Sequence, residues 1–590
     1  MQKETGQISI HAANMMPIIK KWLYSDRDIF LREIISNAYD ATRKREVIGQ
    51  EIADRRIDII ADEKEGTLSI IDHGVGMTDE EVRRYINQVA FSGAQEFVKN
   101  YEAAGDIIGH FGLGFYSAFM VADWVSIDTL SCLEGAQAIK WQSAGGLDYE
   151  MQPSDRAQVG TCVTIKIADD AKEFLTQETL QQTLEKYCSF MPIPIYLTAG
   201  DEVQGPINDV HPLYIKPPRE CTKEEYDAFY TKTFHQWEAP LFHIHLNVDY
   251  PFNLKGILYF PRLQSDFRQD GVIKLYANQV FVADNIREIV PEFLLLLKGV
   301  IDCPDIPLNV SRSFLQNDGY VKRLSAHIVR KVADKIVELF ESDRAQFESY
   351  WDDIEPFVKY GCLRDESFYD RVKDALLYKN SEGGYVTVEE YKKALGEQGE
   401  SAEILYASDG ERQASTIALL RQQGAEVVLM QNALDTPFMQ FIELKGGISF
   451  VRVDAKLHKG LEGETAEDAQ GIIEIFKAAL GEDEHLKVEA RRLEVDTVPA
   501  LLLSDENIRR FRDASRIWGS QGMEIPQEQT LVLNLSHPLI ERLAKGELLD
   551  NAKDICLNIY DLAQMAQAPL DAQRMTAFIQ RTTRLLSALK

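Results

Sequence analysis

Three polar side chains recur at helical spacing in an otherwise apolar stretch near the start of the sequence. The stretch runs from Ser25 to Lys44, and Glu33, Asn37 and Asp40 stand at positions i, i+4 and i+7. In an α-helix this spacing places all three on one face, and Lys44 extends the same row. Such a row either lines a ligand pocket or is a solvated helix face. Taken alone, the stretch favours the solvated face.

A second candidate motif ends an apolar strand. Asp72 closes the strand, and Gly74 and Gly76 follow it at alternating positions. Glycine permits turns with unusual dihedral angles and a close approach of the backbone to a ligand. A buried carboxylate needs a hydrogen-bonded partner, which an adenine amine could supply. Asp-Gly turns also produce this pattern often, so the motif alone is a weak signal.

A glycine-rich loop supplies the third motif. Gly109, Gly112 and Gly114 precede an apolar segment that predicts a helix. Successive backbone N–H groups in such a loop, together with a helix N-terminus, can bind a phosphate. The loop lacks the Gly-Lys-Ser/Thr of a Walker sequence and the βαβ unit of a dinucleotide-binding fold. A flexible loop without a ligand is the alternative.

The elements that hold these motifs mix helices with strands. Apolar spacing predicts a helix over 25–44 with a capping box at Ser25 and Asp28. Its buried stripe is predicted to contain Phe30, Ile34, Ala38 and Ala41, with Leu31 and Ile35 beside it. Strands are predicted at 67–72, 124–130 and 161–167, and an edge strand, because of its prolines, at 191–197. The polar stretch 198–209 predicts a linker.

The rest of the chain continues this α+β pattern. Strands are predicted at 242–250, 255–261 and 529–535, a helical segment at 505–518 and a closing helix at 571–589. We therefore predict an α+β chain with three domains, at 1–205, 206–485 and 486–590.

Composition narrows the class of protein. The 590 residues carry 64 basic and 93 acidic side chains, a net charge of −29, which disfavours nucleic acid as a partner. The sequence begins without a secretory signal pattern, and its apolar runs are too short to span a bilayer. Seven cysteines without metal-ligand spacing fit a reducing cytoplasm, so we expect a cytoplasmic protein without structural zinc.

In this order, the three motifs resemble the Bergerat ATP-binding fold of DNA gyrase B subunits, heat-shock-protein-90 chaperones, sensor histidine kinases and mismatch-repair ATPases. The resemblance implies that the helix row lines an ATP pocket. Asn37 would hold Mg²⁺, and Asp40 and Lys44 would lie near the sugar and phosphates. Glu33 would orient and deprotonate the attacking water.

The same resemblance assigns the adenine and phosphate contacts. Asp72 would receive the adenine amine, supported by Thr161, with Gly76 and Met77 against the base. The other implied ATP-binding residues are Ser92, Gly93, Gly109, Phe111, Gly112, Leu113, Gly114 and Phe115.

Segments along nearly the whole chain, such as IFLREIISNAYDA, IGHFGLGFYSAFMVAD, IKLYANQVFVAD and IPLNVSRSFLQ, resemble the heat-shock protein 90 family. The absence of a long charged linker and of an acidic Met-Glu-Glu-Val-Asp tail resembles its bacterial, high-temperature protein G branch. The resemblance implies that Arg312 reaches the γ-phosphate and that Gln316 supports it. Trp237, Trp518 and Met523 match candidate client contacts, with local packing as the alternative for each.

The implied function is an ATP-dependent chaperone that drives a dimeric clamp. The resemblance implies a homodimer joined through the C-terminal domain, client proteins in non-native states and a DnaK-type chaperone system as a further partner. Asn87-Gln88 and Ala94 replace the Gly-Thr and Thr that most family members carry in the lid, so a glycine hinge is lost at Asn87. The alternatives are a gyrase or mismatch-repair type ATPase, a histidine kinase, and a nucleotide-binding scaffold without turnover.

Overall fold

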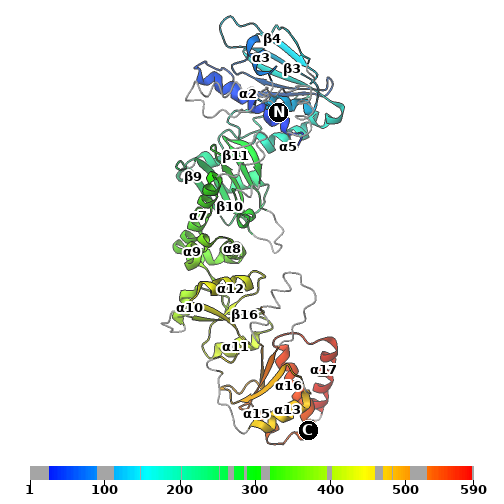
Figure 1. Ribbon diagram of the computed structural model, residues 1–590, viewed down its shortest axis with the longest axis vertical. Coiled ribbons are helices and arrows are strands. Elements are labelled where there is room, and N and C mark those ends of the chain that lie inside the picture. Colours follow the sequence, from blue (N-terminus) through cyan, green and yellow to red (C-terminus); the bar gives the residue numbers. More distant parts are fainter. Residues whose placement is uncertain are drawn as a thin grey trace, which may run out of the picture. The chain divides into compact units, whose positions relative to one another are not determined.

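The computed structural model (Figure 1) divides into two compact units, the first ending at Ile328 and the second beginning at Val329. It describes residues 26–88, 112–145, 148–200, 202–251, 253–262, 271–284, 289–306, 319–394, 402–458, 461, 469–481, 483–504, 510 and 528–587. The predicted three-domain boundaries stay predictions. Among the described residues, no helix has the length and apolar character needed to cross a membrane.

An eight-stranded sheet forms the first part of the first unit. Its order is β5-β4-β3-β6-β2-β1-β7-β8, and all neighbours are antiparallel except β1 and β7. The strands are β1 (Ile57–Asp62), β2 (Thr67–Asp72), β3 (Ala122–Leu130), β4 (Ile139–Ser143), β5 (Glu150–Pro153), β6 (Gly160–Ile167), β7 (Ile195–Ala199) and β8 (Glu202–Gln204). The predicted strands near 67, 124 and 161 are confirmed as β2, β3 and β6.

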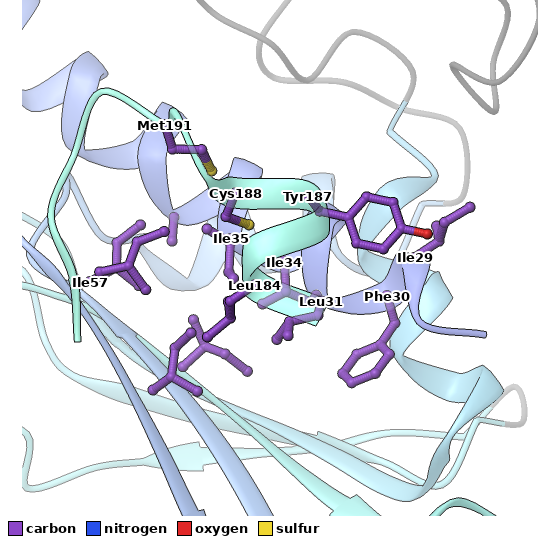
Figure 2. Close-up of a cluster of buried hydrophobic side chains, with 14 of the residues drawn as sticks. Ile29, Phe30, Leu31, Ile34, Ile35, Ile57, Leu184, Tyr187, Cys188 and Met191 are labelled. Carbon is purple, nitrogen blue, oxygen red and sulfur yellow. The ribbon is translucent and has the colours of Figure 1, made fainter. Parts of the chain in front are cut away.

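Helices pack against this sheet around the predicted apolar stripe. They are α2 (Ile29–Val47), α3 (Asp79–Tyr85), the 3₁₀ segments η2 (Gly114–Met120) and η3 (Asp169–Leu175), and α5 (Gln177–Cys188). Figure 2 shows Leu184 and Cys188 of α5 against Ile34 and Ile35 of α2, and all four are buried. The stripe thus packs α2 against both α5 and the sheet.

Two local predictions in this region are wrong. Asp28 is the N-cap of α2, but its side chain caps no backbone N–H; it accepts hydrogen bonds from Lys186 Nζ at 2.8 Å and from the Tyr187 hydroxyl at 2.9 Å. A tertiary ion pair has therefore taken the group that the capping box would have used, and Ser25 lies outside the described residues. The predicted edge strand, β7, is covered by β8, which forms within the predicted linker; Pro192 and Pro194 precede β7 and so remove no ladder hydrogen bond.

A five-stranded sheet follows in the same unit, in the order β12-β11-β13-β10-β9. Its strands are β9 (Phe242–Val248), β10 (Leu254–Phe260), β11 (Ile273–Ala277), β12 (Val280–Asp284) and β13 (Lys298–Asp302). The helical elements are η4 (Leu213–Ile215), η5 (Pro218–Glu220), α6 (Lys223–Phe234) and η6 (Glu292–Leu296). Phe190, just after α5, lies 5.1 Å from Tyr276 and 5.4 Å from Tyr214 between ring centroids, so one aromatic core joins the two sheets.

The second unit is helical at first and then mixed. α7 (Gly319–Ser342) contains the boundary between the units and leads to α8 (Arg344–Arg364), α9 (Glu366–Val372) and η7 (Lys373–Ala375). Next come β14 (Tyr378–Lys379), β15 (Tyr385–Val386) and α10 (Val388–Ala394). A parallel sheet, β17-β16-β18, is built from β16 (Ala402–Ala407), β17 (Val427–Leu429) and β18 (Ile448–Arg452), with α11 (Ala414–Gln422) and α12 (Asp435–Lys445).

The last hundred residues form a smaller α+β region. The sheet order is β19-β21-β20, from β19 (Leu486–Arg491), β20 (Ala500–Ser504) and β21 (Gln529–Asn534). Its helical elements are α13 (Gln470–Leu480), α15 (Pro538–Ala544), η9 (Leu549–Asn551), α16 (Ala552–Met565) and α17 (Ala572–Ser587). The predicted closing helix is confirmed as α17, while the segment 505–518 lies outside the described residues except for Arg510.

Candidate functional site

The polar row of α2 is largely buried, which a solvated helix face would not be. Glu33 and Asp40 are each 5% exposed, Lys44 is half-buried, and only Asn37 is exposed. Burial lowers the pKa of the Lys44 ammonium, and the carboxylates of Asp40 and Glu81 oppose that shift. Buried charges of this kind mark a functional pocket more often than a wet surface.

The Glu33 carboxylate is held from two sides. Its Oε1 accepts hydrogen bonds from Arg32 Nε at 3.1 Å and Nη2 at 2.8 Å, and Arg32 is itself buried. Its Oε2 faces the backbone of Gly114, where an added Cβ would lie 2.5 Å away. The structure therefore brings the first and third motifs into contact, and a Cβ at position 114 would displace the Glu33 carboxylate.

The carboxylate of Asp72 is buried at the end of β2, as its motif predicted. Its Oδ1 accepts hydrogen bonds from the backbone N–H of Gly74 at 2.8 Å and of Thr161 at 3.3 Å. In the described part of the chain, Oδ2 accepts no hydrogen bond. Burial raises the pKa of Asp72 to about 7, and the two backbone hydrogen bonds partly oppose this shift. Oδ2 is thus available to a donor such as an amine.

Thr129, which the motifs did not reveal, links Asp72's surroundings to the Gly76 turn. Asp72, Thr161 and Thr129 stand opposite one another across β2, β6 and β3. The fully buried Thr129 hydroxyl lies 3.0 Å from the Thr161 hydroxyl and accepts a hydrogen bond from Met77 N–H at 2.9 Å. No local pattern marks this residue, because the strand register alone places it here.

The two glycines after Asp72 serve contacts within the protein. An added Cβ on Gly74 would lie 2.4 Å from the Ala41 carbonyl carbon of α2, so this glycine lets the turn touch the helix. Gly76 has φ +63° and would clash with the Leu130 carbonyl at 1.9 Å. Both approaches fix the turn that brings Met77 N–H to Thr129.

The described end of the glycine loop differs from its prediction. Gly112 has φ +64°, and Gly114 is itself the first residue of a 3₁₀ segment, η2, where an α-helix was expected. Phe115 packs edge-on against Trp141 at 5.8 Å and Phe119 at 6.1 Å. Tight aromatic packing after Gly114 accounts for the short element.

Several predicted residues cannot be compared with the structure. Outside the described residues lie Ser92, Gly93, Ala94, Gly109, Phe111, Arg312, Gln316, Trp518 and Met523. Trp237 is described and is 99% exposed, so the alternative that it is a packing aromatic is wrong. Among the described residues no group of His, Cys, Asp or Glu is arranged to hold a metal ion by itself.

Three features define an ATPase of the Hsp90-like class. They are the buried Asp72 carboxylate on the sheet, the Glu33 carboxylate on α2, and Gly114 against Glu33. Residues 26–151 match the family model described as histidine kinase-, DNA gyrase B- and HSP90-like ATPase, and residues 202–589 match the model of Hsp90 protein. The chain belongs to the Hsp90 family.

Individual relatives agree with this assignment over almost the full chain. The chaperone protein HtpG of Porphyromonas gingivalis is 42% identical over 577 residues, covering 92% of this chain and 84% of the relative. HtpG of Bacteroides thetaiotaomicron is 40% identical over 588 residues, covering 93% and 85%. HtpG of Geobacter sulfurreducens is 28% identical over 653 residues, covering 100% and 98%.

The family settles the function at the level of the whole protein. The chain is an ATP-dependent chaperone of the bacterial HtpG branch, with an Hsp90-like ATPase domain and client proteins as its partners. The gyrase, mismatch-repair and histidine-kinase alternatives are therefore wrong. The predicted α+β fold class is confirmed.

Proposed function

We propose that this chaperone binds the adenine of ATP through Asp72 and hydrolyses ATP with Glu33 as the general base. The observation that carries the proposal is the buried Asp72 carboxylate, whose Oδ1 is held by two backbone N–H groups while Oδ2 is left for the adenine amine. Thr161 and Met77 complete this end of the pocket through Thr129.

In this proposal Glu33 of α2 abstracts the proton. Its Oε1 accepts hydrogen bonds from Arg32 and its Oε2 faces Gly114, and this carboxylate takes the proton of the attacking water. Gly112, Leu113, Gly114 and Phe115 approach the phosphates, with Asp40 and Lys44 on the sugar and phosphate side. Arg312, supported by Gln316, stabilises the charge that develops on the γ-phosphate, as the resemblance implies.

Asn37 fits the Mg²⁺ that accompanies ATP in such sites. It is the exposed member of the α2 row, one helical turn from Glu33, and its amide oxygen is a ligand type that Mg²⁺ accepts. When bound, the ion neutralises charge on the phosphates. One protein ligand is sufficient, because Mg²⁺ in nucleotide sites takes most of its ligands from phosphates and water.

We also propose a homodimer joined through α17. This helix has no buried residue; Leu585 packs partly against the core, whereas Ile579 and Leu586, seven residues apart, are 55% and 62% exposed. Arg574 and Arg581 bind the buried Asp561 of α16, so α17 is held with the face of Ile579 and Leu586 outward. A second copy of the same face would cover it isologously.

The remaining partners follow from the family. Exposed Trp237 supports a client contact in the region between α6 and β9. Trp518 and Met523 stay candidates for the same role, and a DnaK-type system and a cytoplasmic location are proposed with the family.

The catalytic assignment is tested with full-length variants Glu33→Ala and Arg312→Ala. Both should bind ATP within about threefold of the wild type, and turnover of Glu33→Ala should fall by ~100-fold or more, the usual contribution of a general base. Wild-type turnover in Glu33→Ala would assign the base to another group, and unimpaired Arg312→Ala would remove that arginine from the mechanism.

The dimer is tested by sedimentation of Leu586→Asp beside Gln580→Asp, a matched change at an exposed polar position of α17. Leu586→Asp should sediment as a monomer and the control as a dimer. A dimeric Leu586→Asp would place the interface elsewhere.

A further inference from the structure

Contacts near strand β4 join two short segments that are distant in sequence. Ile86 and Asn87 directly follow α3, and Phe115 and Tyr116 lie in the first turn of η2; the stretch 89–111 between them is not described. The buried Tyr116 hydroxyl donates a hydrogen bond to the Ile86 carbonyl. This hydrogen bond links the two segments directly. Trp141 forms a second link between them, because it contacts both Asn87 and Phe115.

Trp141 of β4 contacts both segments at once. It is 4% exposed; its indole Nε1–H donates to Asn87 Oδ1 at 2.9 Å, and its ring lies edge-on to Phe115 at 5.8 Å and 68°. Tyr149 stacks on the other side of the indole at 6.4 Å and 21°. Because an indole N–H can only donate, it fixes which end of the Asn87 amide faces it.

The Asn87 side-chain amide has a buried N–H group with no hydrogen-bond acceptor among the described residues, and this does not stabilise the fold. Its Nδ2 is buried, and in the described part of the chain it makes no hydrogen bond. A buried donor without a partner destabilises a fold and calls for another explanation. The single bond to Trp141 is thus the polar interaction that orients this side chain.

The contact continues to the catalytic carboxylate. Phe115 follows Gly114, whose backbone leaves no room for a Cβ beside Glu33 Oε2. Because Phe115 is bonded directly to Gly114, the packing of its ring constrains the Gly114 backbone beside Glu33. The route from Trp141 to Glu33 runs through Phe115 and Gly114, so the effect of Trp141 is indirect.

We propose that Trp141 is a positioning residue for ATP hydrolysis. Through its hydrogen bond to Asn87 and its ring contact with Phe115, it holds Gly114 against Glu33. This inference rests on the assignment of Glu33 as the base. Trp141 and Asn87 act as a pair, because either alone leaves the hydrogen bond unmade.

The test is a double-mutant cycle in the full-length protein with Asn87→Ala, Trp141→Phe and the double variant. Trp141→Phe keeps a ring beside Phe115 and removes the N–H donor. Each single variant should lower kcat about fivefold, equivalent to about 1 kcal/mol, with KM for ATP within twofold. The double variant should be no slower than the slower single variant, since all three lose the same bond.

Matched controls separate this bond from general damage. Glu80→Ala changes an exposed side chain of α3, and Trp124→Phe makes the same ring change on the adjoining strand β3; both should keep wild-type kcat. Intrinsic tryptophan emission should shift in Asn87→Ala and not in Glu80→Ala. If Trp141→Phe does not fold, Asn87→Asp takes its place in the test, because it keeps the acceptor oxygen. Asn87→Asp should retain kcat within twofold, whereas Asn87→Ala should lower kcat about fivefold.

Three results would overturn the proposal: unchanged kcat in both single variants, additive losses in the double variant, or a rise in KM with kcat unchanged. The assignment of Glu33 as the base and the proposed role of Trp141 are contradicted by different results. Retained turnover in Glu33→Ala overturns the base, whereas an additive cycle overturns the link between Asn87 and Trp141 whichever group is the base.

Discussion

The proposed adenine end and phosphate end of the pocket are built on different kinds of structure. Asp72, Thr161 and Thr129 stand in register on three neighbouring strands, and their hydrogen bonds run across the sheet. At the other end, Glu33 on a helix meets Gly114 at the start of a short 3₁₀ segment. A sheet register is fixed by many ladder bonds at once, whereas a loop contact depends on a few side chains. Changes at the first end should therefore alter ATP affinity, and changes at the second should alter turnover.

Asp72→Asn should have the largest effect. The amide keeps an acceptor for Gly74 and Thr161 but presents N–H groups where the adenine amine needs an acceptor. ADP affinity, measured by calorimetry, should fall by ~100-fold, equivalent to about 3 kcal/mol. Asp302→Asn is the matched control, since burial also raises the pKa of that carboxyl, to about 6, at a position on β13. Unchanged affinity in Asp72→Asn would remove Asp72 from the adenine site.

Gly114→Ala changes the proposed phosphate end and should lower kcat, not ATP affinity. Its Cβ would displace the Glu33 carboxylate, so kcat should fall roughly tenfold or more while ATP affinity stays within about threefold. Gly471→Ala, on α13 with nothing within 4 Å of the new Cβ, is the control and should leave kcat unchanged. A loss of affinity in place of kcat would contradict the division between the two ends.

The pH dependence of binding should follow Asp72. With its pKa at about 7, the carboxyl is mostly neutral at pH 6 and mostly ionised at pH 8, and the ionised form is the stronger acceptor. Affinity for adenosine, which has no phosphate to titrate, should rise by up to about tenfold over this range. Asp72→Asn should remove the dependence, and a flat wild-type profile would show that the neutral carboxyl accepts the amine equally well.

The same shift predicts how Asp72 affects stability. Burial favours the neutral form, so its pKa is raised above the ordinary value of 3.8. The resulting stabilisation is complete below that value and is lost as the pH rises through about 7.

Thr129→Val should have the smallest effect of the set. It removes the hydroxyl that joins Met77 N–H to Thr161, at nearly constant volume. Affinity for ADP should fall about fivefold, equivalent to about 1 kcal/mol, with kcat at saturating ATP unchanged. Thr164→Val, at a half-buried position of the same sheet, is the control. An effect on kcat alone would place Thr129 with the phosphate end.

Elements with a regular period were predictable from the sequence. The apolar stripe of α2 and the alternation in β2, β3 and β6 were correct because each pattern reports directly which side chains are buried. The Asp72 and Glu33 motifs were found for a related reason: polar groups on apolar elements stand out. Errors occurred where a distant partner intervened, as when Lys186 and Tyr187 took the Asp28 carboxylate from the helix cap.

By itself the sequence determined the chemistry of the site: which carboxylates, glycines and helix face were present, and through them the family. The tertiary structure alone decided which groups meet. Strand register places Thr129 beside Thr161, Arg32 holds Glu33, and Trp141 joins Asn87 to Phe115. The physical reason is that periodicity is a property of neighbours along the chain. Hydrogen bonds and ring contacts between distant segments depend on distances that only the packed fold sets.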